Sequence, residues 1–174
     1  MKKRTVFLMI GLLMAFTGSG LAGNTIAYPP DDPALTVAFP EGWTKVADPD
    51  WDKGIIVTSP DEEIEIDLWA LDEKDLQEDP NLEFSIEEVK TIIKEWVVDF
   101  QAGPIETFVS NGIRFVGKQG SGKSKEDGSP VKVSAYFFSP DRKTVFVLMY
   151  WGSAEAEARY ASELKAIARS VNKP

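Results

Sequence analysis

The chain has 174 residues, of which 43% are hydrophobic and 27% are charged, and its formal net charge at pH 7 is −9. It contains no Cys and no His, which excludes disulfide scaffolds, Cys- or His-based metal sites, Cys nucleophiles and the Ser-His-Asp triad. The length suits one domain with its own core, and the acidic balance makes nucleic acid and anionic lipid poor partners.

Residues 1–22 have the pattern of a secretory signal peptide. A basic start at residues 2–4 precedes an apolar run at 6–16, and small residues follow as far as Ala22. The run is shorter than the roughly 20 residues that a membrane span needs. We therefore predict cleavage after Ala22 and a periplasmic or secreted protein that is not inserted in the membrane. The alternative is an uncleaved membrane anchor.

The segment 23–34 is rich in Pro and Asp and is predicted to be an N-terminal tether, so the single domain would span 35–174. The first two predicted strands cover 35–39 and 54–59, each followed by residues typical of turns.

The third predicted strand, 63–71, alternates strictly between polar and apolar residues. One predicted face carries Ile64, Ile66, Leu68 and Ala70, and the other carries Glu63, Glu65, Asp67 and Trp69. We expect the acidic face to be exposed to solvent and to bind a protein partner, if one is bound at all. Two alternatives remain: an acidic face that only keeps the sheet soluble, and a carboxylate-based hydrolase, because same-face residues lie roughly 7 Å apart.

A helix is predicted after an acidic loop at 72–81. Ser85 and Glu88 have the spacing of a capping box, and Gly103-Pro104 would end the helix. Its apolar stripe comprises Val89, Ile92, Ile93, Trp96, Val97 and Phe100. We expect this stripe to pack on the sheet, with Trp96 at its centre.

The remainder of the chain predicts more strands and a last helix. The strands cover 105–110, 113–119, 131–138 and 143–151, and the first two are joined by the hairpin signal Asn111-Gly112. The strand at 143–151 is apolar on both faces, which predicts a central position covered on both sides. Ser153 is the predicted N-cap of the last helix.

These elements predict an α+β fold in the order βββ-α-βββ-α, with an antiparallel sheet of about six to seven strands flanked by helices. The chain resembles the PsbP-like superfamily over 35–171, through 39–43 (FPEGW), Asn111-Gly112, Asp127-Gly128 and 168–171 (ARSV). The resemblance implies an α/β/α sandwich and a non-catalytic role in binding or assembly. Metal-binding histidines of some members have no counterpart, because the chain has no His, and no Ran-contact residue can be matched.

The residues 117–124 (GKQGSGKS) match the pattern of a phosphate-binding loop. That chemistry needs a helix directly after the loop, whereas Gly128 and Pro130 follow here and lead into a strand. We predict a flexible hairpin loop that binds no nucleotide.

Asp48, Asp50 and Asp52 resemble the start of a Ca²⁺-binding loop. The glycine stands one position late and Ser59 occupies the place of the bidentate carboxylate, so these residues are weak metal candidates. An acidic turn is the favoured interpretation, and no cofactor is predicted.

The sequence thus predicts an exported, non-catalytic binding or accessory factor whose protein partner is unknown. The alternatives are a small periplasmic hydrolase that uses carboxylates and a Ca²⁺-responsive binding module.

Overall fold

The computed structural model describes residues 23–46, 54–71 and 83–174. The predicted signal peptide, the acidic loop and the candidate metal ligands Asp48, Asp50 and Asp52 lie outside these residues.

A seven-stranded antiparallel sheet forms the centre of the molecule. Its strands, in spatial order, are β3 (Thr44–Val46), β4 (Gly54–Thr58), β5 (Ile64–Ala70), β9 (Phe146–Ser153), β8 (Pro130–Phe138), β7 (Ile113–Ser124) and β6 (Val97–Ser110). The α+β class and the antiparallel sheet are as predicted.

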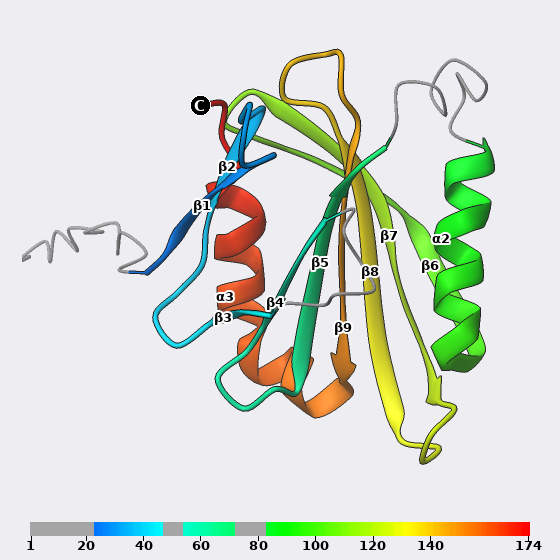
Figure 1. The fold of residues 1–174 in the computed structure, drawn as a ribbon. Helices are drawn as coiled ribbons and strands as arrows, with labels where there is room; N and C mark the ends of the chain where they lie inside the picture. Colours follow the sequence, from blue (N-terminus) through cyan, green and yellow to red (C-terminus); the bar gives the residue numbers. More distant parts are fainter. Residues whose placement is uncertain (1–22, 47–53, 72–82) are drawn as a thin grey trace, which may run out of the picture.

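Two different layers cover the two faces of this sheet (Figure 1). Helix α2 (Glu83–Trp96) lies on one face. Helix α3 (Ala154–Ser170) lies on the other, together with a hairpin of β1 (Thr25–Tyr28) and β2 (Leu35–Ala38). The predicted tether is therefore wrong for its first half, because Thr25–Tyr28 pairs with Leu35–Ala38 and Tyr28 is buried.

Each face of the sheet has its own hydrophobic cluster. The larger one joins the sheet to α3 and the β1–β2 hairpin, and it includes Leu68 and Phe146. The smaller one joins the sheet to α2, and it includes Val89, Ile93 and Met149. Strand β9 occupies the middle of the sheet and alternates between the two clusters, so the prediction of a central strand covered on both sides is confirmed.

Helix α2 differs from the prediction at both ends. It begins at Glu83, so Ser85 lies inside the helix and not at its N-cap. It ends at Trp96, and Val97 already belongs to strand β6. Gly103-Pro104 therefore does not end a helix. It lies within β6, at an edge of the sheet where the register shifts, and an edge strand tolerates the missing N–H of proline.

The turn chemistry of the second half of the chain is confirmed. Asn111 and Gly112 have φ values of 51° and 74° and join β6 to β7. Ser153 caps α3 by accepting a hydrogen bond from the amide of Ala156 at 3.0 Å.

The phosphate-loop-like segment 117–124 is not the predicted loop. It forms most of β7 and pairs with β6 and β8 on its two sides. A side chain at Gly117 would bring its Cβ within 2.1 Å of the carbonyl oxygen of Ala135. This glycine is therefore needed for the close approach of two strands.

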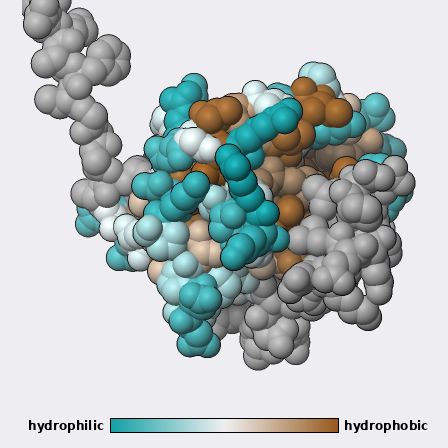
Figure 2. Space-filling view, turned by 90° about the horizontal axis from the view of Figure 1, so that it is seen from above, coloured by the Kyte–Doolittle hydropathy of each residue, from teal (hydrophilic) through white to brown (hydrophobic). Residues whose placement is uncertain are grey.

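Several apolar side chains of β6 remain at the surface. Ile105 is 66% exposed and Val109 is 68% exposed. Seen from above, hydrophobic residues lie interspersed with hydrophilic ones on the surface of the described residues (Figure 2).

Candidate functional site

Strand β5 has the two faces that its alternation predicted, but neither face is open to solvent. Ile64, Ile66 and Leu68 face α3. The opposite face is covered by α2, so Asp67 is only 6% exposed and Trp69 only 7%. The expectation of an acidic, solvent-exposed face is wrong for these two residues, because the alternation separates the faces without revealing what packs on them.

Glu63 does not join the other acidic residues of that predicted face. Its side chain accepts a hydrogen bond from the hydroxyl of Ser153 and pairs with Arg159 of α3 at 3.0 Å. The structure brings together Glu65 and Asp67, whereas Glu63 belongs to the end of the sheet where α3 begins.

Glu65 and Asp67 line a cavity between the sheet and α2. We call it the acid–tryptophan pocket, after Glu65, Asp67, Trp96 and Trp151. Its volume is about 290 Å³. The other lining residues are apolar and come from β4, α2, β6, β8 and β9: Ile56, Ile92, Ile93, Val97, Val133 and Met149.

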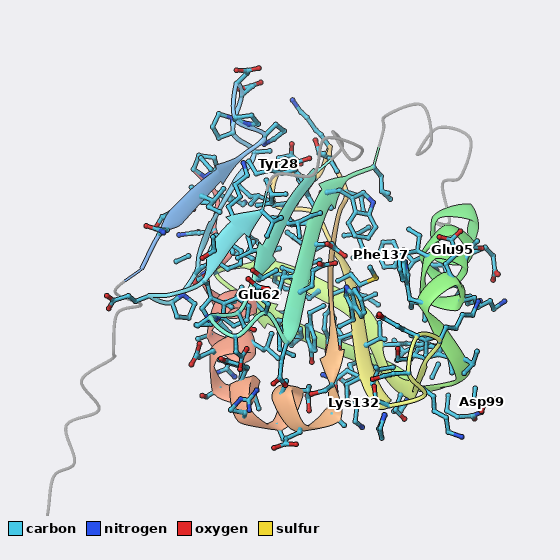
Figure 3. The ribbon with its side chains drawn as sticks, turned by 60° about the horizontal axis from the view of Figure 1, so that its bottom comes forward. Tyr28, Glu62, Glu95, Asp99, Lys132 and Phe137 are labelled. Carbon is cyan, nitrogen blue, oxygen red and sulfur yellow. The ribbon has the colours of Figure 1, made fainter. Side chains whose placement is uncertain are left out.

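The position of the pocket follows from the strand register. Asp67 lies between Ile56 of β4 and Met149 of β9, and Glu65 lies opposite Trp151. Helix α2 closes the pocket from above the sheet. Phe137 of β8 lies on the side of the sheet that faces this helix, and Glu95 lies on the helix itself (Figure 3).

Asp67 is the least usual group in the pocket. No described residue forms a hydrogen bond with its Oδ1 atom, although that atom is buried. Burial raises the pKa of the Asp67 carboxyl group to about 7, and the negative charge of Glu65 adds to this rise. A buried carboxylate without a partner is costly, so the pocket favours either a proton or an external cation at this position.

Glu65 and the two tryptophans form the more open part of the pocket. The Nε1 atom of Trp151 donates a hydrogen bond to Oε1 of Glu65 at 2.9 Å. The ring of Trp96 stacks on that of Trp151, with 6.1 Å between ring centroids and 27° between planes. Trp96 is 58% exposed. The expectation that Trp96 packs deep against the sheet is therefore wrong, and Ile93 takes that place.

A larger cavity of about 410 Å³ lies on the opposite face, between the sheet and α3. Several of its polar side chains form hydrogen bonds with one another. The hydroxyl of Tyr136 donates to Glu106 at 3.0 Å and accepts a hydrogen bond from Gln119 at 3.1 Å. Burial raises the pKa of Tyr136 well above its usual value. We therefore regard the acid–tryptophan pocket as the better candidate for a ligand site.

Within the described part of the chain, no cluster of three or more acidic residues could hold a metal ion. The pocket itself offers two carboxylates.

Sequence reasoning found Glu65 and Asp67 but missed Trp96 and Trp151 as site residues. The signal for Trp151 was available, because Val147, Met149 and Trp151 alternate along one face of a central strand. Nothing in the sequence indicated that this face and the acidic face of β5 are the same face of the sheet.

None of the helices in the described residues is long and apolar enough to span a membrane. No protein-family model matches the sequence, and no curated protein is similar enough to count as a match.

Solved structures, in contrast, show clear similarity in fold. Cyanobacterial PsbP (CyanoP) from Synechocystis sp. PCC 6803 aligns with a TM-score of 0.57 at 11% identity, over 93% of this chain and 99% of that chain. The Ran-binding protein Mog1p of Saccharomyces cerevisiae gives 0.56 at 14% identity, over 88% and 96%. LpqN of Mycobacterium tuberculosis, which is involved in cell envelope biogenesis, gives 0.57 at 16% identity, over 87% and 91%. At such identities the likeness concerns the fold, and the chain has the fold of the PsbP-like and Mog1-like proteins.

Proposed function

We propose that this protein is an exported, non-catalytic binding or accessory factor, and that the acid–tryptophan pocket is its binding site. The fold is shared with PsbP and with Ran-binding Mog1p, which supports a role in binding. Export is supported by the pattern of residues 1–22.

The observation that carries the proposal is Asp67. Its carboxyl group is buried, no described residue forms a hydrogen bond with its Oδ1 atom, and Asp67 lines a cavity of about 290 Å³. A structural carboxylate at this depth would normally have hydrogen-bond donors around it. An external group that supplies those donors would gain more free energy here than at an exposed carboxylate, because little solvation remains to be lost.

The proposal is tested by comparing what the purified protein and its variants retain from an extract of the native cell envelope. Trp151→Ala removes one wall of the pocket and the hydrogen bond to Glu65, whereas Asp31→Asn changes an exposed acid far from the pocket. We expect the wild type and the control variant to retain the same molecule and the folded Trp151→Ala variant to lose it. Equal retention by all three would show that the pocket is not the binding site.

A hydrolase is the second candidate, and Asp67 is again the reason. The Asp67 carboxyl group, with a pKa of about 7, could act as a general acid near neutral pH, and the carboxylate of Glu65 lies beside it as the second acidic group. A panel of nitrophenyl glycosides and esters tests this candidate. Turnover by the wild type that is lost in Asp67→Asn would make the protein an enzyme and overturn the non-catalytic proposal.

A further inference from the structure

We propose that the acid–tryptophan pocket binds the primary ammonium group of an alkylamine, supplied either by a free amine or by a lysine side chain of a partner protein. This inference rests on the proposed function, because it names the ligand class of the same pocket.

The two carboxylates are spaced so that a single ammonium group can contact both. Glu65 and Asp67 are two residues apart on one face of β5, so their side chains start roughly 7 Å from each other. An ammonium nitrogen placed between them can donate one hydrogen bond to each carboxylate. Its positive charge would stabilise the ionised Asp67 carboxylate, whose buried Oδ1 atom has no hydrogen-bond donor among the described residues, and its third N–H would remain for Glu65 or water.

The charge of the pocket points to a cation. The described lining residues include two acids and no Lys or Arg, so the described protein does not itself neutralise the site. An anion would be repelled by both carboxylates. Ca²⁺ would need six to eight oxygen ligands, which two carboxylates cannot supply without several waters.

The remaining walls suit an alkyl chain that ends in a positive charge. The stacked indoles of Trp96 and Trp151 stand at the more exposed side, and indole faces attract cations. Ile56, Val133 and Met149 are apolar and line the same pocket, where the methylene groups of an amine can be buried. A quaternary ammonium group fits less well, because it has no N–H to donate to Asp67.

The test uses calorimetric titration of the purified protein with n-pentylammonium and with 1-pentanol, which has the same chain length and no charge. We expect the ammonium to bind about tenfold or more tightly than the alcohol. Asp67→Asn and Glu65→Gln should each remove most of that difference, and the control Asp31→Asn should keep it. Salt should weaken the ammonium binding.

The pH dependence gives a second readout. Glu65 is the only other titratable side chain among the described residues that line the pocket. Because Asp67 must be ionised to bind the cation, affinity should increase as the pH rises from 6 to 8. A blocked lysine, Nα-acetyl-lysine N-methylamide, distinguishes the two sources: binding as tight as that of pentylammonium indicates a lysine side chain of a partner, and much weaker binding indicates a free amine.

Equal binding of pentanol and pentylammonium, or ammonium binding that survives in both acid variants, would overturn the inference while leaving the pocket as the binding site. The inference would also be overturned if the protein bound no amine at all while its retention of the envelope molecule still depended on Trp151. If retention is independent of Trp151 as well, the proposed function fails too.

Discussion

The Asp67 carboxyl group is expected to make the stability of this protein fall as the pH rises towards 7. Its pKa is raised from 3.8 to about 7 by burial and by the charge of Glu65. Between these two values the folded protein holds a proton at Asp67 that the unfolded chain has released, so folding becomes less favourable with increasing pH. At 1.36 kcal/mol per pKa unit, a rise of about three units amounts to about 4 kcal/mol.

The substitution Asp67→Asn removes this dependence, because the amide has nearly the same shape and does not ionise. Its buried N–H groups lower the free energy of unfolding by a constant amount, so the informative quantity is the difference between variant and wild type as a function of pH. The free energy of unfolding of the variant minus that of the wild type should increase by about 4 kcal/mol between pH 4 and pH 8. Most of the increase should be complete at pH 7. Acids such as Asp61, whose pKa is lowered by the hydrogen bond from Ser59, titrate in both proteins, so their contributions to the difference cancel.

The assay is urea denaturation followed by far-ultraviolet circular dichroism at intervals of one pH unit. The control is Asp31→Asn, which makes the same chemical change at an exposed position of the β1–β2 turn. Its difference from the wild type should stay flat within about 0.5 kcal/mol. A flat profile for Asp67→Asn as well would show that the Asp67 carboxyl group is solvated or paired, and the reasoning about the pocket would be refuted.

Four further substitutions test the packing and the phosphate-loop interpretation. Ile93→Ala should lower the free energy of unfolding by about 2–5 kcal/mol in urea denaturation, and Trp96→Ala by only about 1 kcal/mol. The reason is that Ile93 is buried whereas Trp96 is 58% exposed. A larger loss for Trp96→Ala than for Ile93→Ala would contradict the placement of α2. Gly117→Ala should cost about 1–3 kcal/mol, since its Cβ would meet the backbone of Ala135, and an unchanged melting temperature would argue against this strand pairing. Lys123→Ala should leave the melting temperature unchanged, and ATP with Mg²⁺ should not shift it; micromolar ATP binding that this variant loses would restore the phosphate-loop interpretation.

The sequence predicted the order of elements well wherever local chemistry decides the structure. The turn at Asn111-Gly112 and the cap at Ser153 depend on neighbouring residues only, and both are confirmed. The end of α2 was wrong because Val97 and Phe100 fit a helical period and also face the cluster under α2 from a strand. When the same apolar residues fit both the helical period and the strand period, the pattern cannot show where the helix ends and the strand begins.

The candidate site was harder to predict because it depends on contacts between distant segments. Glu65 and Trp151 are 86 residues apart and meet only through the pairing of β5 with β9. Whether Asp67 is exposed depends on where α2 lies, which no local pattern contains. Alternation therefore identified the correct acids and assigned them the wrong environment.

The unequal clusters on the two faces of the sheet have a consequence for local opening. Helix α2 is held by the smaller cluster, whereas α3 is anchored in the larger one, and the chain beyond it pairs with β2 through Thr36 and Asn172. The amide protons of α2 should therefore exchange with solvent through partial unfolding that leaves the sheet and α3 intact. Since this helix forms one wall of the acid–tryptophan pocket, a bound molecule would slow exchange in α2 first. Exchange in this helix would then report occupancy of the pocket, to which α2 contributes Ile92, Ile93 and Trp96.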